Sequence, residues 1–177
     1  MRKSFIIIPL IAGVVGVLGV AGPASAATSA NTTLTFTESA GAISITAPTT
    51  ATLLPALVHT GVDQTVSAAI GDVVVTDDQG NDAGWTASAS ATDFIDGAGH
   101  TIPIADASYT PTTAAVIGTA TVTPTTLPAL DTTATAVQTA TAVAGDNTAT
   151  WNPTISLTVP GTAVPGTYTS TLTQSVI

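Results

Sequence analysis

The densest group of polar side chains in the sequence is the run Asp77–Asp82, which reads Asp-Asp-Gln-Gly-Asn-Asp. Carboxylate and amide oxygens of this kind are ligands for a hard cation such as Ca²⁺. The spacing does not match the calcium loop Asp-x-[Asp/Asn]-x-[Asp/Asn]-Gly, and no Glu follows at the required distance. Asp, Asn and Gly also favour turns through local hydrogen bonds or positive φ angles. The run is therefore predicted to be a solvated turn between two strands, and no metal site is assigned.

Two imidazoles and a carboxylate pair are the candidates for general acid-base chemistry: His59, His100, Asp93 and Asp96. With the abundant serines they contain the residue types of a hydrolytic triad. The sequence has neither a Gly-x-Ser-x-Gly elbow nor a His-Glu-x-x-His motif. His100 ends a glycine-rich stretch and His59 lies two residues before a glycine, so both are predicted to lie on loops. We therefore predict that the protein is not an enzyme, and we assign no catalytic residue and no cofactor.

The few aromatic residues after position 26 are a further source of binding chemistry: Phe36, Trp85, Phe94, Tyr109, Trp151 and Tyr168. A Trp on a strand among small neighbours fills core space, and Trp85 would share one face with Ala87 and Ala89. The alternative is a flat aromatic surface that stacks on the sugar rings of a cell-wall glycan. The core interpretation is favoured for both tryptophans, with glycan contact kept open, most of all for Trp85.

The elements that must position these residues are predicted to be strands, because β-branched Thr is abundant and alternation is frequent. Leu34 and Phe36 alternate with threonines, and Ile43 and Ile45 do the same before a proline, which predicts two half-buried strands. Further runs, separated by Gly, Pro, Asn or Asp, are Val73–Val75, Trp85–Ala91, Ala115–Thr123, Ile155–Val159 and Tyr168–Val176. This spacing predicts an all-β, β-sandwich-like (Ig-like) single domain.

Two segments are ambiguous. Asp131–Gly145 has an N-cap candidate, many alanines and a terminal glycine, which are helix signals. Its many Thr and Val residues are stiff at χ1 and alternate with Ala, so a strand is favoured. Thr110–Thr126 is rich in Thr, Ala and Pro, and is interpreted as either a loosely held strand pair or a flexible loop, a candidate for O-glycosylation.

The chain begins with the pattern of a secretory signal peptide: Arg2 and Lys3, the apolar run Phe5–Val20, and the small-residue site Ala24–Ala26. A membrane anchor is the alternative, because the run is nearly long enough to cross a bilayer. A proline interrupts the run and a cleavage site follows it, so the signal peptide is favoured. Once it is cleaved, the mature protein is predicted to leave the membrane.

Residues 1–26 are therefore excluded from the fold, and residues 27–177 form the predicted domain. The whole chain has a net charge of -9, and all 11 acidic residues lie in this domain, which has no Lys or Arg. Nucleic acid and anionic lipid would repel such a surface, so neither is expected as a partner. The absence of cysteine excludes disulfides and thiol redox chemistry.

The segment Val73–Gly80, followed by Gly84–Ala87 and then Ala91–Phe94, resembles the first conserved segment of the WxL domain family of bacterial cell-surface domains. In that family a strand that ends in an Asp and Gly turn precedes a Trp-x-Leu strand, and a second Trp-x-Leu follows near the C-terminus. Here Tyr168–Val176 fills the second place. The stretch Thr150–Pro160, with the Gly-Thr-Tyr that ends at Tyr168, resembles actinobacterial members.

The sequence departs from the family pattern at three positions: Ala87 replaces the first Leu, and Gln174 and Val176 stand where the second Trp and Leu would be. The resemblance implies an all-β secreted domain that attaches non-covalently to Gram-positive peptidoglycan. The departures make the chain a divergent WxL-like member, and they affect the expected attachment more than the expected fold.

The predicted function is that of a secreted, non-enzymatic surface protein that binds peptidoglycan or another cell-wall glycan outside the cell. Its predicted ligand-binding residues are Trp85, Asp77, Asp78 and Asp82. The alternative is a self-assembling structural or adhesive subunit whose Thr-rich edge strands pair with copies of itself or with other surface proteins.

Overall fold

The computed structural model describes residues 31–177, and the chain divides into two units, Met1–Thr37 and Glu38–Ile177. In the first unit, residues 31–37 form no strand, and the side chains of Leu34 and Phe36 are 89% and 86% exposed. The prediction of a strand there is therefore wrong, because alternation creates an apolar face but supplies no neighbouring strand to cover that face. The predicted signal peptide lies outside the described residues.

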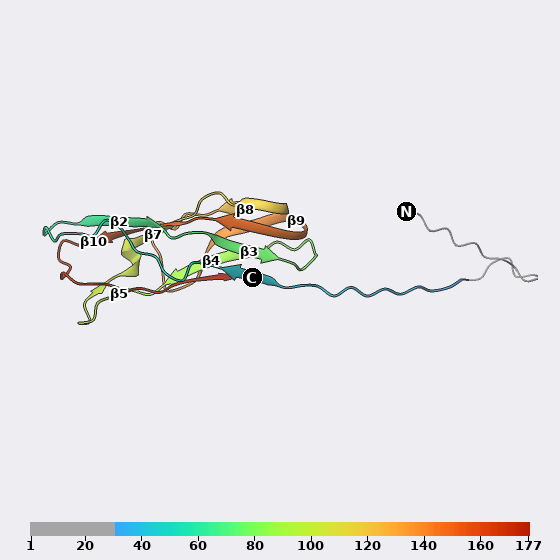
Figure 1. The fold of residues 1–177 in the computed structure, drawn as a ribbon, viewed down its shortest axis with the longest axis horizontal. Helices are drawn as coiled ribbons and strands as arrows, with labels where there is room; N and C mark the ends of the chain where they lie inside the picture. The colour runs from blue at the N-terminus through green and yellow to red at the C-terminus, as the bar shows by residue number, and fades with distance from the viewer. Residues whose placement is uncertain (1–30) are drawn as a thin grey trace, which may run out of the picture. The chain divides into compact units, whose positions relative to one another are not determined.

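The regular secondary structure of the second unit consists almost entirely of antiparallel strands, which Figure 1 shows as arrows. They are β1 (Ile43–Thr46), β2 (Gln64–Ala69), β3 (Val73–Asp77), β4 (Thr86–Ala91), β5 (Phe94–Ile95), β6 (Thr101–Ile102), β7 (Ala107–Thr110), β8 (Ala115–Pro124), β9 (Thr135–Trp151), β10 (Thr154–Val159) and β11 (Leu172–Val176). One 3-10 turn, η1 (Ile104–Asp106), precedes β7. The predicted all-β, sandwich-like fold is confirmed.

The strands form a large sheet, a three-stranded sheet and a short hairpin. The large sheet has the order β1-β3-β9-β4-β11, with β8 paired to β9, and the three-stranded sheet has the order β2-β10-β7. The first half of β9 pairs with β4 and its second half with β3, while β8 runs along both halves. The end strands β1 and β11 come close to each other, so the large sheet nearly closes on itself.

The core lies between these sheets because alternate residues of each strand face inward. The burial pattern alternates strictly along β3 and β4, and the alanines on β4 leave room for large rings. Trp151 and Tyr109 are among the largest fully buried side chains, and Trp85 is 3% exposed. The core interpretation of both tryptophans is therefore confirmed.

Both segments whose sequences were ambiguous, Thr110–Thr126 and Asp131–Gly145, contain strand in the structure. Residues 135–145 belong to the 17-residue strand β9, so strand rather than helix is confirmed there. Residues 115–124 form the single strand β8, which is neither the strand pair nor the loop that the composition suggested. Of the predicted run Tyr168–Val176, only the part from Leu172 is strand. The strands β2 and β7 were not predicted, because their sequences lack a clear apolar alternation.

Candidate functional site

A buried chain of hydrogen bonds lies where β3 ends and the acidic turn begins. The indole Nε1 of Trp85 donates to Oδ1 of Asn147 at 3.1 Å, and Nδ2 of Asn147 donates to Oδ2 of Asp77 at 2.9 Å. All three side chains are at most 4% exposed. Buried polar groups need hydrogen-bond partners, and these two hydrogen bonds supply partners for the indole, the amide and the carboxylate in the core. The ring of Trp85 presents no open face on which a sugar could stack.

Local backbone packing explains how Trp85 reaches this position. The backbone N–H of Ala140 donates to the carbonyl of Trp85 at 2.9 Å, which ties the residue to β9. Its neighbour Gly84 lies so close to the Ala140 carbonyl that an added Cβ would meet the oxygen at 2.3 Å. A glycine is therefore required before Trp85, which matches the Gly-Trp pair of the motif.

The acidic turn divides the predicted ligand residues into two pairs. Asp77 is buried with Trp85, and its Oδ1 accepts the backbone N–H of Gln79 at 3.2 Å. Asp78 and Asp82 are exposed, so their carboxylates are open to solvent. The predicted connection between two strands is thus confirmed for residues 78–82, whereas Asp77 is the last residue of β3 and is buried, so the solvated position predicted for it is wrong. Ligand binding by these four residues stays a prediction.

The two places of the Trp-x-Leu motif are neighbours in space although they are almost 90 positions apart in the sequence. Strands β4 and β11 pair so that Ala87 lies opposite Val176 and Ala89 lies opposite Gln174. Thr86 and Ile177 exchange both of their backbone hydrogen bonds. The motif positions therefore form one paired ladder at the edge of the large sheet.

A second series of hydrogen bonds joins the buried Trp151 and Tyr109 to the half-buried Gln174 on β11. The hydroxyl of Tyr109 donates to Oε1 of Gln174 at 2.9 Å and accepts a hydrogen bond from Nε1 of Trp151 at 3.1 Å. Burial raises the pKa of Tyr109 to about 12, because the phenolate would lose its hydration. Gln174 stands where the family pattern has its second Trp, and it accepts a hydrogen bond from a buried hydroxyl. Nothing in the local sequence indicates this role.

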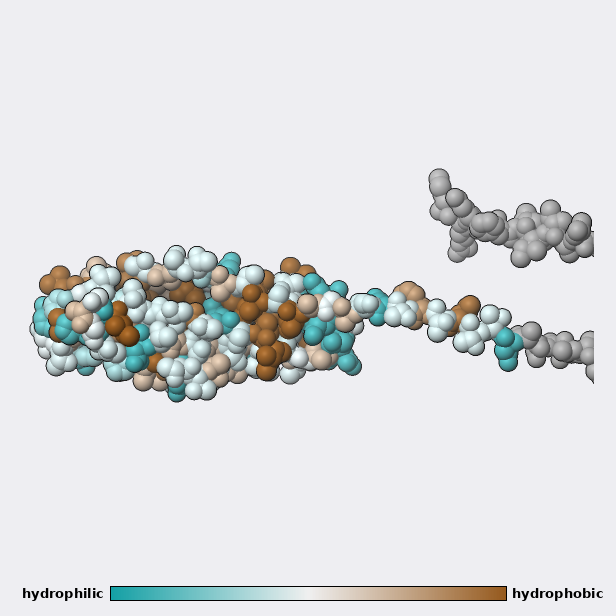
Figure 2. All heavy atoms as spheres, turned by 90° about the horizontal axis from the view of Figure 1, so that it is seen from below, coloured by the Kyte–Doolittle hydropathy of each residue, from teal (hydrophilic) through white to brown (hydrophobic). Residues whose placement is uncertain are grey.

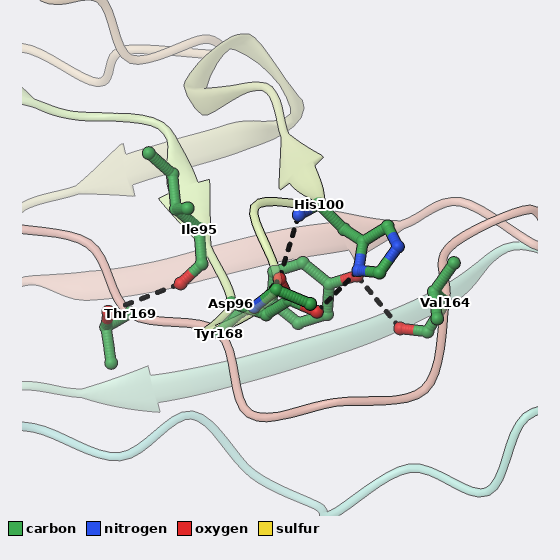
Figure 3. A network of polar contacts seen from close by, with 7 residues as sticks. Ile95, Asp96, His100, Val164, Tyr168 and Thr169 are labelled. Atoms are coloured by element: carbon green, nitrogen blue, oxygen red, sulfur yellow. Dashed lines mark hydrogen bonds and ion pairs between the residues drawn. The ribbon is translucent and has the colours of Figure 1, made fainter.

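The histidine and aspartate candidates are tied to turns and do not form a catalytic constellation. Figure 3 shows the imidazole of His100 against Asp96, with Nδ1 2.7 Å from Oδ2. The His100 hydrogen bond lowers the pKa of the Asp96 carboxyl, opposed by desolvation. Asp93 accepts the backbone N–H of Ile104 at 2.8 Å, and His59 is exposed in a loop. The loop prediction for both histidines is confirmed.

Two grooves open on this unit, and both are lined mainly by apolar and hydroxyl side chains. One, of about 420 Å³, lies between the ends of β1 and β11 and includes Ile45, Phe94 and Leu172. The other, of about 540 Å³, is lined by loop residues that include Leu57 and Tyr168. Figure 2 shows a face on which hydrophobic patches alternate with polar surface and shallow hollows. No charged cluster lines either groove, which suits neutral ligands.

Within residues 31–177, no three His, Asp or Glu side chains are placed to share a metal ion. In the same part of the chain, no helix is long and apolar enough to cross a bilayer.

Comparison with known proteins identifies the class to which this fold belongs. Residues 29–176 match the family described as "WxL domain surface cell wall-binding". The chain therefore belongs to the WxL domain family, a family of surface domains that bind the cell wall. The resemblance to the WxL domain family is thus confirmed.

Other comparisons add little. No curated protein matches the chain. A family 123 glycoside hydrolase from Clostridium perfringens, studied for glycolipid glycan hydrolysis, shares 16% identity with a TM-score of 0.35. That alignment covers 66% of this chain and 18% of the hydrolase chain, so the chain spans less than a fifth of that enzyme. This likeness carries no argument about function.

Proposed function

We propose that this protein is exported and binds the peptidoglycan of the Gram-positive wall non-covalently, without catalysing a reaction. The observation that carries the proposal is the family match over residues 29–176. The pairing of both motif segments on β4 and β11 supports it, because the two tracts then belong to one ladder of the large sheet and not to unrelated parts of the fold.

Within this proposal, the exposed carboxylates of Asp78 and Asp82 contact the wall. Carboxylate oxygens are strong acceptors for the hydroxyl and amide N–H groups of a glycan with peptide stems. Trp85 and Asp77 act from inside, by holding the turn against β9 through Asn147. This division follows from burial: a ring that is 3% exposed can position a contact but cannot make one.

The test is co-sedimentation of purified residues 27–177 with isolated Gram-positive peptidoglycan. Wild-type protein is expected in the pellet. The double variant Asp78→Asn/Asp82→Asn is expected to stay in solution, because each amide loses the charge that strengthens its hydrogen bonds.

A matched control is the double variant Asp72→Asn/Asp106→Asn, which removes the same charge from exposed aspartates elsewhere. It is expected to pellet like wild type. If wild type stays in solution, the wall-binding proposal is wrong. If both double variants lose binding equally, the effect is one of net charge and the assignment to the acidic turn is wrong.

A second candidate function is that of a self-assembling surface subunit. The observation that favours it is the uncovered outer edge of β8, a strand that pairs on one side only among the described residues. Light scattering at increasing protein concentration tests this function, which predicts assembly in the absence of any wall polymer.

A further inference from the structure

The outer edge of β8 is the longest open strand edge in the described part of the chain. β8 is ten residues long, most of them exposed, and pairs with β9 alone. Ile117, which lies on its solvent face, is 76% exposed. An edge strand of this kind offers a row of unpaired backbone N–H and C=O groups to another strand.

The part of β8 from Thr119 to Thr123 is regular, although its pairing with β9 shifts in register. The shifts place the additional residues on β9, where Ala142 has φ 51° and Gly145 has φ 70°. Bulges on an edge strand usually prevent pairing by twisting the edge away. On β8 itself, Gly118 has φ 89°, at the register shift beside Thr119. The central segment Thr119–Thr123 contains no residue with positive φ, so that protection is absent from the centre of the edge.

The outer edges of β2, β7, β1 and β11 are less open than that of β8. An isolated bridge between Leu54 and Ser67 covers β2, and a bridge between Leu127 and Tyr109 covers β7. The short strands β1 and β11 lie close to each other where the large sheet nearly closes. This contrast makes β8 the edge that remains available to a partner.

Charge indicates what the partner is. Every charged side chain of residues 27–177 is acidic apart from any protonated His, so two copies repel each other over most of their surface. Residues 107–130 contain no Asp, Glu, Lys or Arg, and β8 lies in the middle of this stretch. Asp146, the nearest acid along the ladder, lies by the bulge next to Gly118 and away from the centre of the strand.

From these observations we infer that β8 pairs antiparallel with β8 of a second copy of this chain, around a two-fold axis close to Ala120. In that register, Thr119 of one copy lies opposite Thr121 of the other. Cross-strand Thr pairs of this kind are favourable. A two-fold interface closes after two copies, so the product is a dimer.

This inference goes beyond wall binding and gives the second candidate function a defined surface. The two failures are distinguishable, because dimer formation is measured without wall polymer. Assembly that proceeds through another edge would support a self-assembling subunit and contradict the role of β8.

The first experiment is sedimentation equilibrium of residues 27–177 and of two single variants. Thr121→Glu puts a carboxylate at the centre of the β8 edge, and Thr173→Glu makes the same change on the exposed face of β11. Wild type and Thr173→Glu are expected to form dimers with equal dissociation constants. Thr121→Glu is expected to raise the dissociation constant at least about tenfold, because the two new charges occupy diagonally adjacent positions about 7–8 Å apart across the axis.

Circular dichroism must show that both variants are folded like wild type. A wild-type protein that is monomeric at every concentration overturns the inference, and so do equal dissociation constants for the two variants.

A second experiment fixes the register and uses the absence of cysteine from the natural chain. A mixture of Thr119→Cys and Thr121→Cys is expected to form the mixed disulfide faster than either variant forms its own, because directly opposite Cβ atoms lie about 4.5–5.5 Å apart. No preference for the mixed product overturns the proposed register.

Discussion

Replacing Trp151 by alanine is expected to remove a large part of the stability of the domain. The ring is 1% exposed at the end of β9, opposite Val73 of β3. Loss of such a ring costs about 3–5 kcal/mol through lost transfer energy and the cavity that remains. The broken bond to Tyr109 adds little, because the hydroxyl keeps Gln174 as its acceptor and no buried donor is stranded.

This magnitude is large against the stability of an ordinary domain, which is about 5–15 kcal/mol. For a chain of this length, each kcal/mol lowers the melting temperature by about 2–4 °C, so a loss of about 6–20 °C is expected. Urea unfolding followed by circular dichroism measures the free energy directly, with the slope m as a check on compactness.

Phe36→Ala is the matched control, because it also removes an aromatic ring but from a side chain that is 86% exposed. Its expected effect is within about 0.5 kcal/mol of zero. A folded Trp151→Ala protein that loses less than about 1 kcal/mol would refute the packing argument, because the ring would then contribute no more than a surface residue.

Three further perturbations probe the polar chains. Asn147→Asp places a second carboxylate beside Asp77, where the Asn147 amide now lies 2.9 Å from Oδ2, so the pKa of one carboxyl of the pair rises in the variant. The variant should lose about 2–4 kcal/mol of unfolding free energy at pH 7 and regain stability as the pH falls. Urea unfolding midpoints at several pH values measure both effects. Tyr109→Phe leaves the Trp151 N–H without its acceptor and should cost about 1–3 kcal/mol by the same method, whereas an unchanged midpoint would mean that water replaces the hydroxyl. His100→Ala should raise the pKa of Asp96 toward its ordinary value of 3.8 in an NMR titration. Because that pKa is lowered in the folded protein, the stabilisation from the Asp96 carboxylate is present above pH 3.8 and is lost as the pH falls through the folded pKa. An Asp96 pKa that is the same in the variant as in the wild type would contradict the role of the imidazole.

Much of the fold could be predicted because its signals are local. Alternation of apolar and hydroxyl residues correctly indicated β1, and runs bounded by Gly, Pro, Asn or Asp correctly indicated β3, β4 and β10. The χ1 stiffness of Thr and Val correctly favoured strand over helix in β9. The alternation signal was misleading at Leu34 and Phe36, where alternation is present and no strand forms. Alternation states which residues share a face, and a strand also requires a neighbour to bond.

The candidate site was harder to predict because its contacts are distant in sequence. Nothing around Asn147 indicates that it bonds to Trp85, 62 positions away, or to Asp77, 70 positions away. The antiparallel ladders from β9 to β3 and β4 bring these positions together. Only that pairing reveals that Asn147 connects the turn to the ring.

By itself, the sequence determined the all-β class, the strand connection that contains residues 78–82 and the family of the domain, because each depends on residue types at short spacing. The tertiary structure alone decided that Asp77 is buried, that Gln174 lies opposite Ala89, and that β8 has an open edge. The physical reason is that burial and pairing are properties of two segments at once. A residue pattern defines a face or an edge, but only the packed chain decides what covers it.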